Sequence, residues 1–132
     1  LTTEGKPGLV MAFQDATAAF DSSGLCIFTS FAWSLGDIQP QIDAACEGDW
    51  TLEKLSEVGE RIWNLEKLFN LAAGLTKDDD KLPERLTSEP AESGPAKGLV
   101  SGVPEMLPEY YQVRGWDSEG NPNADTRKRL GL

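Results

Sequence analysis

Residues 52–73 read LEKLSEVGERIWNLEKLFNLAA, and this stretch decides the fold. Its apolar side chains recur every three or four residues, the spacing of one helix face: Leu55, Val58, Ile62, Leu65, Phe69 and Ala72. Thr51 suits the N-cap, Glu53 suits the first turn, and Gly74 predicts the end of the helix. We therefore expect a long amphipathic helix over 52–73, and we expect its apolar stripe to organise the core.

The rest of the chain predicts shorter helices and almost no strand pattern, so we expect an all-α fold. These helices are expected at 9–20, 39–47, 104–114 and 124–130. Residues 25–34 are apolar enough to be buried, and periodicity alone does not separate helix from strand there. Residues 76–103 are polar and rich in Pro and Gly, which predicts a long flexible loop. We expect residues 1–132 to form a single helical domain that contains this loop.

The composition excludes several function classes. The chain has 12 Lys and Arg against 22 Asp and Glu, a formal net charge of −10, and no His. An anionic chain without a basic cluster is a poor ligand for nucleic acid. The absence of His removes His general bases, Ser-His-Asp machinery and His metal sites. The chain has 2 Cys, too few for an all-thiolate zinc site or a disulfide framework.

The sequence also lacks the usual signals for a membrane or an exported protein. The longest weakly polar run, residues 24–35, is shorter than the about 20 residues that a membrane-spanning helix needs. Residues 1–8 lack the basic and apolar regions of a signal peptide. We therefore expect no membrane contact and a cytoplasmic location. Because the chain begins with Leu and lacks His, we also expect it to be a fragment of a larger protein.

One short stretch combines a carboxylate, a tight turn and a thiol: Asp21-Ser22-Ser23-Gly24-Leu25-Cys26. The carboxylate of Asp21 can accept hydrogen bonds from an amino-pyrimidine edge, and Gly24 lets the backbone approach a flat ligand. Cys26 can bind iron as a thiolate. The alternative interpretation is a helix-ending turn, a glycine C-cap and a small buried hydrophobe. Spacing alone favours this alternative, because such short motifs often occur by chance.

Three motifs follow one another along the chain. The first is D-x-x-G-L-C at 21–26, and the third is MLPEYYxxRGWDxxGxP at 106–122, with Leu-Gly-Leu at the end of the chain. The second is GERIWNLEKLFN at 59–70, with shorter matches after it at Gly74, 79–83 and Arg85. In this order and spacing, from about Val10 to the last residue, the chain resembles the C-terminal part of the tungsten-containing aldehyde:ferredoxin oxidoreductase family.

The resemblance implies a multihelical C-terminal domain of an enzyme that oxidises aldehydes to carboxylic acids and passes the electrons to ferredoxin. Enzymes of this family hold tungsten, or sometimes molybdenum, between two pterin dithiolenes, with a [4Fe–4S] cluster beside one pterin. By position, Cys26 would be the fourth cluster ligand and Asp21 a hydrogen-bond acceptor for the pterin. Gly24 and Leu25 would shape the pterin contact. The resemblance assigns no catalytic residue to this chain.

The family's other cluster cysteines, most of the pterin cradle and the acid and His near tungsten are expected upstream, in a missing N-terminal domain. One thiolate does not hold a cluster that needs four ligands. We therefore expect that this chain alone binds neither cluster nor pterin and has no activity. A non-catalytic helical binding or scaffold module stays an alternative, as does a separately encoded subunit. A homo-oligomer also stays open, because apolar surface near residues 25–35 would promote self-association.

Other residues with reactive or metal-binding side chains favour structural roles. Cys46 has no motif around it and is expected to be a structural thiol, although a Cys26–Cys46 disulfide would be open to an oxidised chain. Residues 78–80 are three consecutive Asp without the Gly and distal Glu of a calcium loop, so we expect a solvated loop. Aromatic residues of the second and third motifs are expected in the core or at domain contacts: Trp63, Tyr110, Tyr111 and Trp116.

Overall fold

The computed structural model describes residues 2–132, which contain six α-helices, two short 3-10 helices and no β-strand. The elements are α1 (Lys6–Ser22), η1 (Ile27–Phe31), α2 (Leu35–Ala45), α3 (Leu52–Ala72), η2 (Lys77–Asp79), α4 (Glu84–Ser88), α5 (Val103–Arg114) and α6 (Ala124–Leu130). The predicted all-α class is therefore confirmed.

Helix α3 lies where the sequence predicts it. Thr51 is its N-cap, and the Thr51 hydroxyl accepts a hydrogen bond from the Lys54 amide at 3.3 Å. The helix ends at Ala72, and Gly74 follows with a φ of 96°, a left-handed conformation that glycine adopts without strain. Local capping residues thus set both ends of the longest helix.

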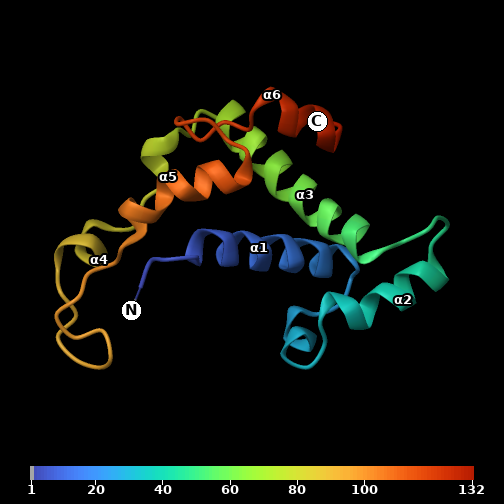
Figure 1. Ribbon diagram of the computed structural model, residues 1–132, viewed down its shortest axis with the longest axis horizontal. Coiled ribbons are helices and arrows are strands. Elements are labelled where there is room, and N and C mark those ends of the chain that lie inside the picture. Colours follow the sequence, from blue (N-terminus) through green and yellow to red (C-terminus); the bar gives the residue numbers. More distant parts are fainter. Residues whose placement is uncertain (1) are drawn as a thin grey trace.

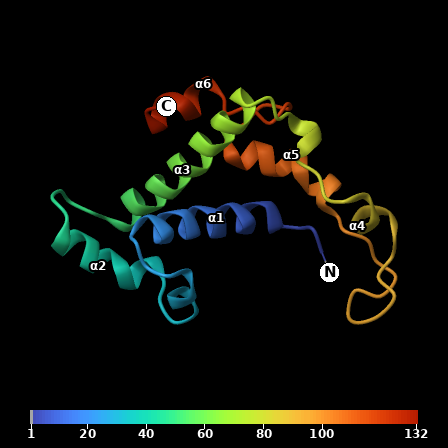
Figure 2. The ribbon, with the colours of Figure 1, turned by 180° about the vertical axis from the view of Figure 1, so that it is seen from behind.

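The other helices are arranged around α3 (Figure 1). Helices α1 and α5 lie on one side of α3, and α6 lies on the other. The reverse view in Figure 2 shows the same order. The buried apolar residues come from α1, α2, α3, α5 and α6 and from the turn after α5: Ala19, Phe20, Ile38, Leu55, Tyr111, Trp116 and Leu130.

Two segments project from this centre at opposite ends and give the molecule an open, arched outline (Figures 1 and 2). One end holds η1 and α2. The other holds α4 and the loop that leads to α5. The predicted loop over 76–103 therefore contains η2 and α4, and hydrogen bonds close it on itself, such as Ser101 N–H to the Leu86 carbonyl at 2.8 Å. Its flexibility stays a prediction.

The prediction of a buried segment over 25–34 is wrong. Residues 27–31 form the 3-10 helix η1 at the surface, where Phe28 is 72% exposed and Phe31 is 86% exposed. The two rings stack on each other with centroids 6.0 Å apart. No helix of the described chain covers the outer face of η1, so most of the surface of both rings stays exposed.

The apolar stripe of α3 is only partly the core. Leu55 is buried as predicted, but Leu65 is 55% exposed and Phe69 is 72% exposed. In this half of the helix the buried positions are Asn64 and Lys67, which bond to groups outside α3. The buried face of this half of α3 therefore differs from the predicted apolar stripe, because polar contacts rather than apolar area decide which face is buried.

Helix α2 begins four residues earlier than the predicted start at residue 39, so Pro40 lies inside it rather than in its first turn. The start is set by a capping box in which Asp37 Oδ2 accepts hydrogen bonds from the Ser34 amide and hydroxyl, each at 2.7 Å. The helix ends at Ala45 with Cys46 as its C-cap. Cys46 and Cys26 are both exposed free thiols.

Candidate functional site

The stretch 21–26 forms a tight turn where α1 ends. The Ser23 amide and hydroxyl both donate to the Phe20 carbonyl, at 3.1 Å and 2.6 Å, and the Gly24 amide donates to the Asp21 carbonyl at 3.1 Å. Gly24 has a φ of 79°, and a Cβ added there would meet nothing within 4 Å. Glycine is therefore required for backbone conformation and not for lack of space, and a flat molecule could approach this backbone closely.

The side chains of this turn are left available. Asp21 and Cys26 are exposed and Leu25 is half-buried. Among the described residues, the Asp21 carboxylate has no hydrogen-bond or ion-pair partner. The Cys26 carbonyl accepts the Thr29 amide at 2.9 Å and its hydroxyl at 2.8 Å, so the backbone is fixed while the thiol stays free. The alternative prediction of Cys26 as a small buried hydrophobe is thus wrong.

An aromatic groove flanks this turn between α1 and η1, with a volume of about 480 Å³. Apolar side chains dominate its wall: Phe13, Phe20, Ile27, Phe31 and Trp33. Phe20 and Ile27 immediately bracket the 21–26 turn in sequence. The turn that carries the free carboxylate and thiol is therefore joined at both ends to the wall of this apolar groove. Sites for mostly apolar ligands combine such a surface with a few polar groups.

A buried polar network lies on the side of α1 that faces α5. The Arg114 side chain is 0% exposed; its Nη1 donates to Asp15 Oδ1 at 2.5 Å and its Nη2 to Gln14 Oε1 at 2.7 Å. Its Nε donates to the Tyr110 hydroxyl at 3.1 Å. Burial raises the pKa of Asp15, and the Arg114 guanidinium only partly offsets this rise. The network joins two helices whose paired residues are far apart in sequence.

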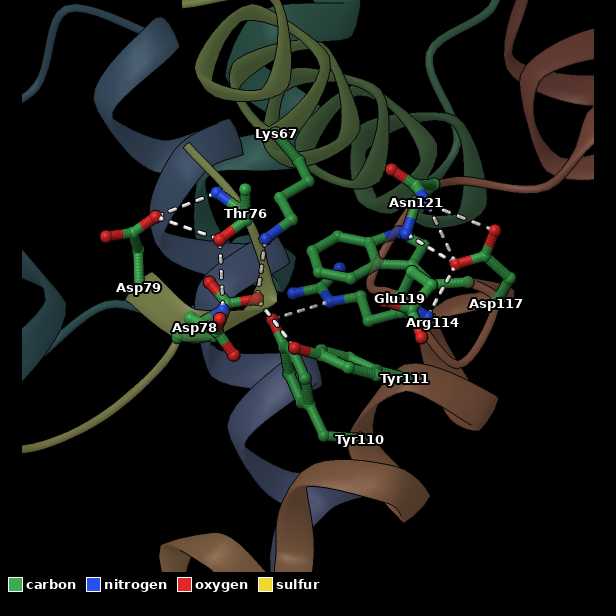
Figure 3. Close-up of polar contacts among 12 residues, drawn as sticks. Lys67, Thr76, Asp78, Asp79, Tyr110, Tyr111, Arg114, Asp117, Glu119 and Asn121 are labelled. Atoms are coloured by element: carbon green, nitrogen blue, oxygen red, sulfur yellow. Dashed lines mark hydrogen bonds and ion pairs between the residues drawn. The ribbon is translucent and has the colours of Figure 1, made fainter. Parts of the chain in front are cut away.

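A second polar cluster surrounds Asp80, and Figure 3 shows the side chains that converge there from α3 and α5. Asp80 Oδ2 accepts hydrogen bonds from Lys67 Nζ at 2.6 Å and from the Tyr111 hydroxyl at 2.7 Å. Burial and the Asp80 carboxylate raise the pKa of Tyr111. The Trp116 indole donates to Asn64 Oδ1 at 2.7 Å. The prediction of a solvated loop at 78–80 therefore fails for Asp80, which is half-buried and ion-paired.

These two clusters contain the four aromatic residues singled out in the sequence. Tyr111 and Trp116 are buried, as predicted, and Trp63 donates to the Tyr110 hydroxyl at 2.9 Å. The partners Gln14 and Asp15 were missed, because a polar pair on a helix gives no sign of a buried Arg about a hundred residues away. Within residues 2–132, no group of three or more Cys, Asp or Glu is placed to hold a metal ion.

The comparisons with known proteins agree with the motif order. The family model described as aldehyde ferredoxin oxidoreductase, domains 2 & 3, matches residues 1–132. The chain belongs to this family. It is 45% identical over 131 residues to the tungsten-containing aldehyde ferredoxin oxidoreductase of Pyrococcus abyssi, 44% to that of Pyrococcus furiosus and 41% to that of Thermococcus kodakarensis. Each alignment covers 98% of this chain and 22% of the relative.

A solved structure shares this fold. The active site complex BamBC of benzoyl coenzyme A reductase, in complex with 1,5-dienoyl-CoA, matches with a TM-score of 0.77 and 22% sequence identity. The match covers 99% of this chain and 20% of the other. At this identity it shows a shared helical fold alone. No helix in residues 2–132 is both long and apolar enough to cross a membrane.

Proposed function

We propose that this chain is the C-terminal part of a tungsten-dependent oxidoreductase, in which residues 21–26 form one edge of the cofactor site. Three facts support the proposal: the chain belongs to the family, its relatives are tungsten-containing aldehyde ferredoxin oxidoreductases, and the D-x-x-G-L-C turn is exposed. In such an enzyme the bound tungsten pterin and iron–sulfur cluster supply the oxidation of a small aldehyde to a carboxylic acid and electron transfer to ferredoxin.

The donor set of the turn fits a shared site and not a complete one. Cys26 offers a single thiolate, so a [4Fe–4S] cluster would need its other three ligands from outside residues 2–132. The Asp21 carboxylate is free to accept hydrogen bonds from the amino groups of a pterin. Gly24 leaves open space for a flat ring, and half-buried Leu25 would pack against its face. The missing N-terminal domain is the expected source of the remaining ligands.

The observation that carries the proposal is the exposed Cys26 thiol on a hydrogen-bonded turn that also holds Asp21, whose carboxylate has no partner among the described residues. A buried thiol could not reach a cluster held by another domain. A thiol on an unsupported loop would lose conformational entropy on binding. Here the backbone around Cys26 is already held, so most of this cost is met when the chain folds.

The test compares Cys26→Ser with Cys46→Ser in the whole protein that contains this sequence. Both thiols are exposed and free, but only Cys26 lies in the turn. We expect Cys26→Ser to lose the [4Fe–4S] electron paramagnetic resonance (EPR) signal and at least one iron per protein, and Cys46→Ser to keep both. Retention of four irons and an unchanged EPR signal in Cys26→Ser would overturn the proposal and favour a non-catalytic helical module.

We further propose that the isolated chain holds neither cluster nor pterin. Anoxic reconstitution of residues 1–132 followed by iron and tungsten analysis tests this. A stoichiometric cluster in the monomer would contradict it, because one thiolate cannot hold four iron atoms.

A further inference from the structure

Helices α1 and α3 touch backbone to backbone at one glycine. A Cβ added at Gly59 would lie 1.9 Å from the Asp15 carbonyl oxygen and 2.6 Å from its carbon. Gly59 is buried in the middle of α3, where glycine destabilises a helix by about 1 kcal/mol relative to Ala. The close approach of the two helices therefore requires glycine at residue 59, because any side chain there would push α1 away from α3.

Arg114 holds the same part of α1 from the side of α5. Its guanidinium reaches the side chains of Gln14 and Asp15, and Nη2 also donates to the Met11 carbonyl at 3.4 Å. These three residues span just over one turn of α1. The guanidinium thus fixes the position of α1 along the helix axis, and Gly59 fixes the distance between α1 and α3.

The 21–26 turn has no such support of its own. Apart from the backbone ladder of α1, the hydrogen bonds that its groups make run to residues 18–29, which are the end of α1, the turn itself and η1. After Ala19 and Phe20, which are buried, the chain emerges into an exposed surface. Among the described residues, α1 is therefore the element that sets where this turn stands relative to the rest of the fold.

We infer that Gly59 and Arg114 are positioning residues that set the place of Asp21 and Cys26 by clamping α1. The inference rests on the proposed function of the turn. An Ala Cβ at residue 59 needs a contact distance of about 3.4 Å, so α1 would shift by about 1.5 Å. Asp21 lies only about 9 Å further along the same helix, at 1.5 Å rise per residue, so the shift reaches the turn.

The test uses the full-length holoprotein with Gly59→Ala and Arg114→Lys, and Gly8→Ala as the matched control. Gly8 lies in α1 itself, and a Cβ there would meet nothing within 4 Å. The measurements are iron content, the midpoint potential and EPR spectrum of the cluster, and kcat and KM. A misplacement of about 1 Å can cost about 100-fold in rate. We therefore expect Gly59→Ala to keep four irons but to show a shifted potential, altered EPR lines and a kcat about 100-fold lower.

Arg114→Lys keeps the charge but cannot reach Gln14, Asp15 and Tyr110 together, so we expect a smaller change of the same kind. Gly8→Ala should match the wild type in all measurements. An unchanged potential, spectrum and kcat in folded Gly59→Ala and Arg114→Lys would overturn the inference. Loss of helix content in both variants would also overturn it, since the two residues would then serve folding alone. These outcomes are distinct from retention of the cluster in Cys26→Ser, which contradicts the proposed function itself.

Discussion

Replacing Arg114 with Ala should lower the free energy of unfolding by about 3–5 kcal/mol, the usual cost of removing one partner of a buried ion pair. The Arg114 side chain is 0% exposed and that of Asp15 is 13% exposed, so water does little to replace the lost partner. The substitution also removes the guanidinium hydrogen bonds to Gln14 Oε1 and the Tyr110 hydroxyl, so these two acceptors keep only the bonds from the Tyr110 hydroxyl and the Trp63 indole. It further removes the cation stacked 5.5 Å from the ring centres of Trp63 and Tyr110.

A loss of this size is large against the about 5–15 kcal/mol that stabilises an ordinary domain. With a urea dependence of about 2 kcal/mol per molar, the unfolding midpoint should fall by about 2 M. Far-ultraviolet circular dichroism during urea titration measures it. Arg114→Ala combined with Asp15→Ala should cost less than the sum of the single changes, by about 1–3 kcal/mol, because no unpaired charge remains.

The result that would refute this reasoning is an Arg114→Ala chain with wild-type helix content and a free energy of unfolding within about 1 kcal/mol of the wild type. The ion pair between Arg114 and Asp15 would then contribute as little to the free energy of unfolding as an exposed ion pair does. Strict additivity of the single and double changes would contradict the direct coupling between Arg114 and Asp15.

Two further predictions concern pH and self-association. Asp15 has its pKa raised above the ordinary 3.8, so its contribution to stability is greatest below about pH 3.8 and is lost as the pH rises through the folded pKa. Asp15→Asn should therefore flatten that part of the stability curve in urea titrations from about pH 3 to about pH 7; a curve parallel to the wild type would contradict it. Phe28→Ser with Phe31→Ser should reduce association of the isolated chain in size-exclusion chromatography with light scattering, whereas Leu86→Ser, at the other end of the molecule, should not. An unchanged mass distribution would show that the exposed rings do not drive association.

The parts of the fold that the sequence predicts well are those set by neighbouring residues. Helix α3 was predicted to within one residue because Thr51, Glu53 and Gly74 act on the helix ends directly. The start of α2 differs from the prediction because Pro40 favours a first turn near residue 40, whereas the Ser34–Asp37 capping box decides the start. Pro40 and the Ser34–Asp37 capping box are both visible in the local sequence, but they favour different starting points for the helix.

The parts that were not predicted depend on contacts across the chain. Arg114 and Asp15 are 99 residues apart, and neither carries a local sign of its partner. The apolar pattern predicts that Phe28, Phe31 and Phe69 are buried, but it does not show whether another element covers them, and all three are exposed. The candidate site was found from the 21–26 motif and the resemblance. The device that holds it, the Gly59 contact, follows only from the distance between two backbones.

The two sides of α1 have different chemistry, and this difference fits the proposed role of residues 21–26 as one edge of a shared cofactor site. Towards α3 and α5, α1 is bound by Gly59 and by a buried, fully paired guanidinium. Towards η1 it presents exposed Phe13, one wall of the aromatic groove and the free Asp21 side chain, and the turn that follows carries the free Cys26 thiol. A site whose remaining ligands come from another domain needs this combination. In the proposed enzyme, the polar side would fix the turn before the other domain docks, and the apolar side would offer that domain the area whose burial stabilises the contact.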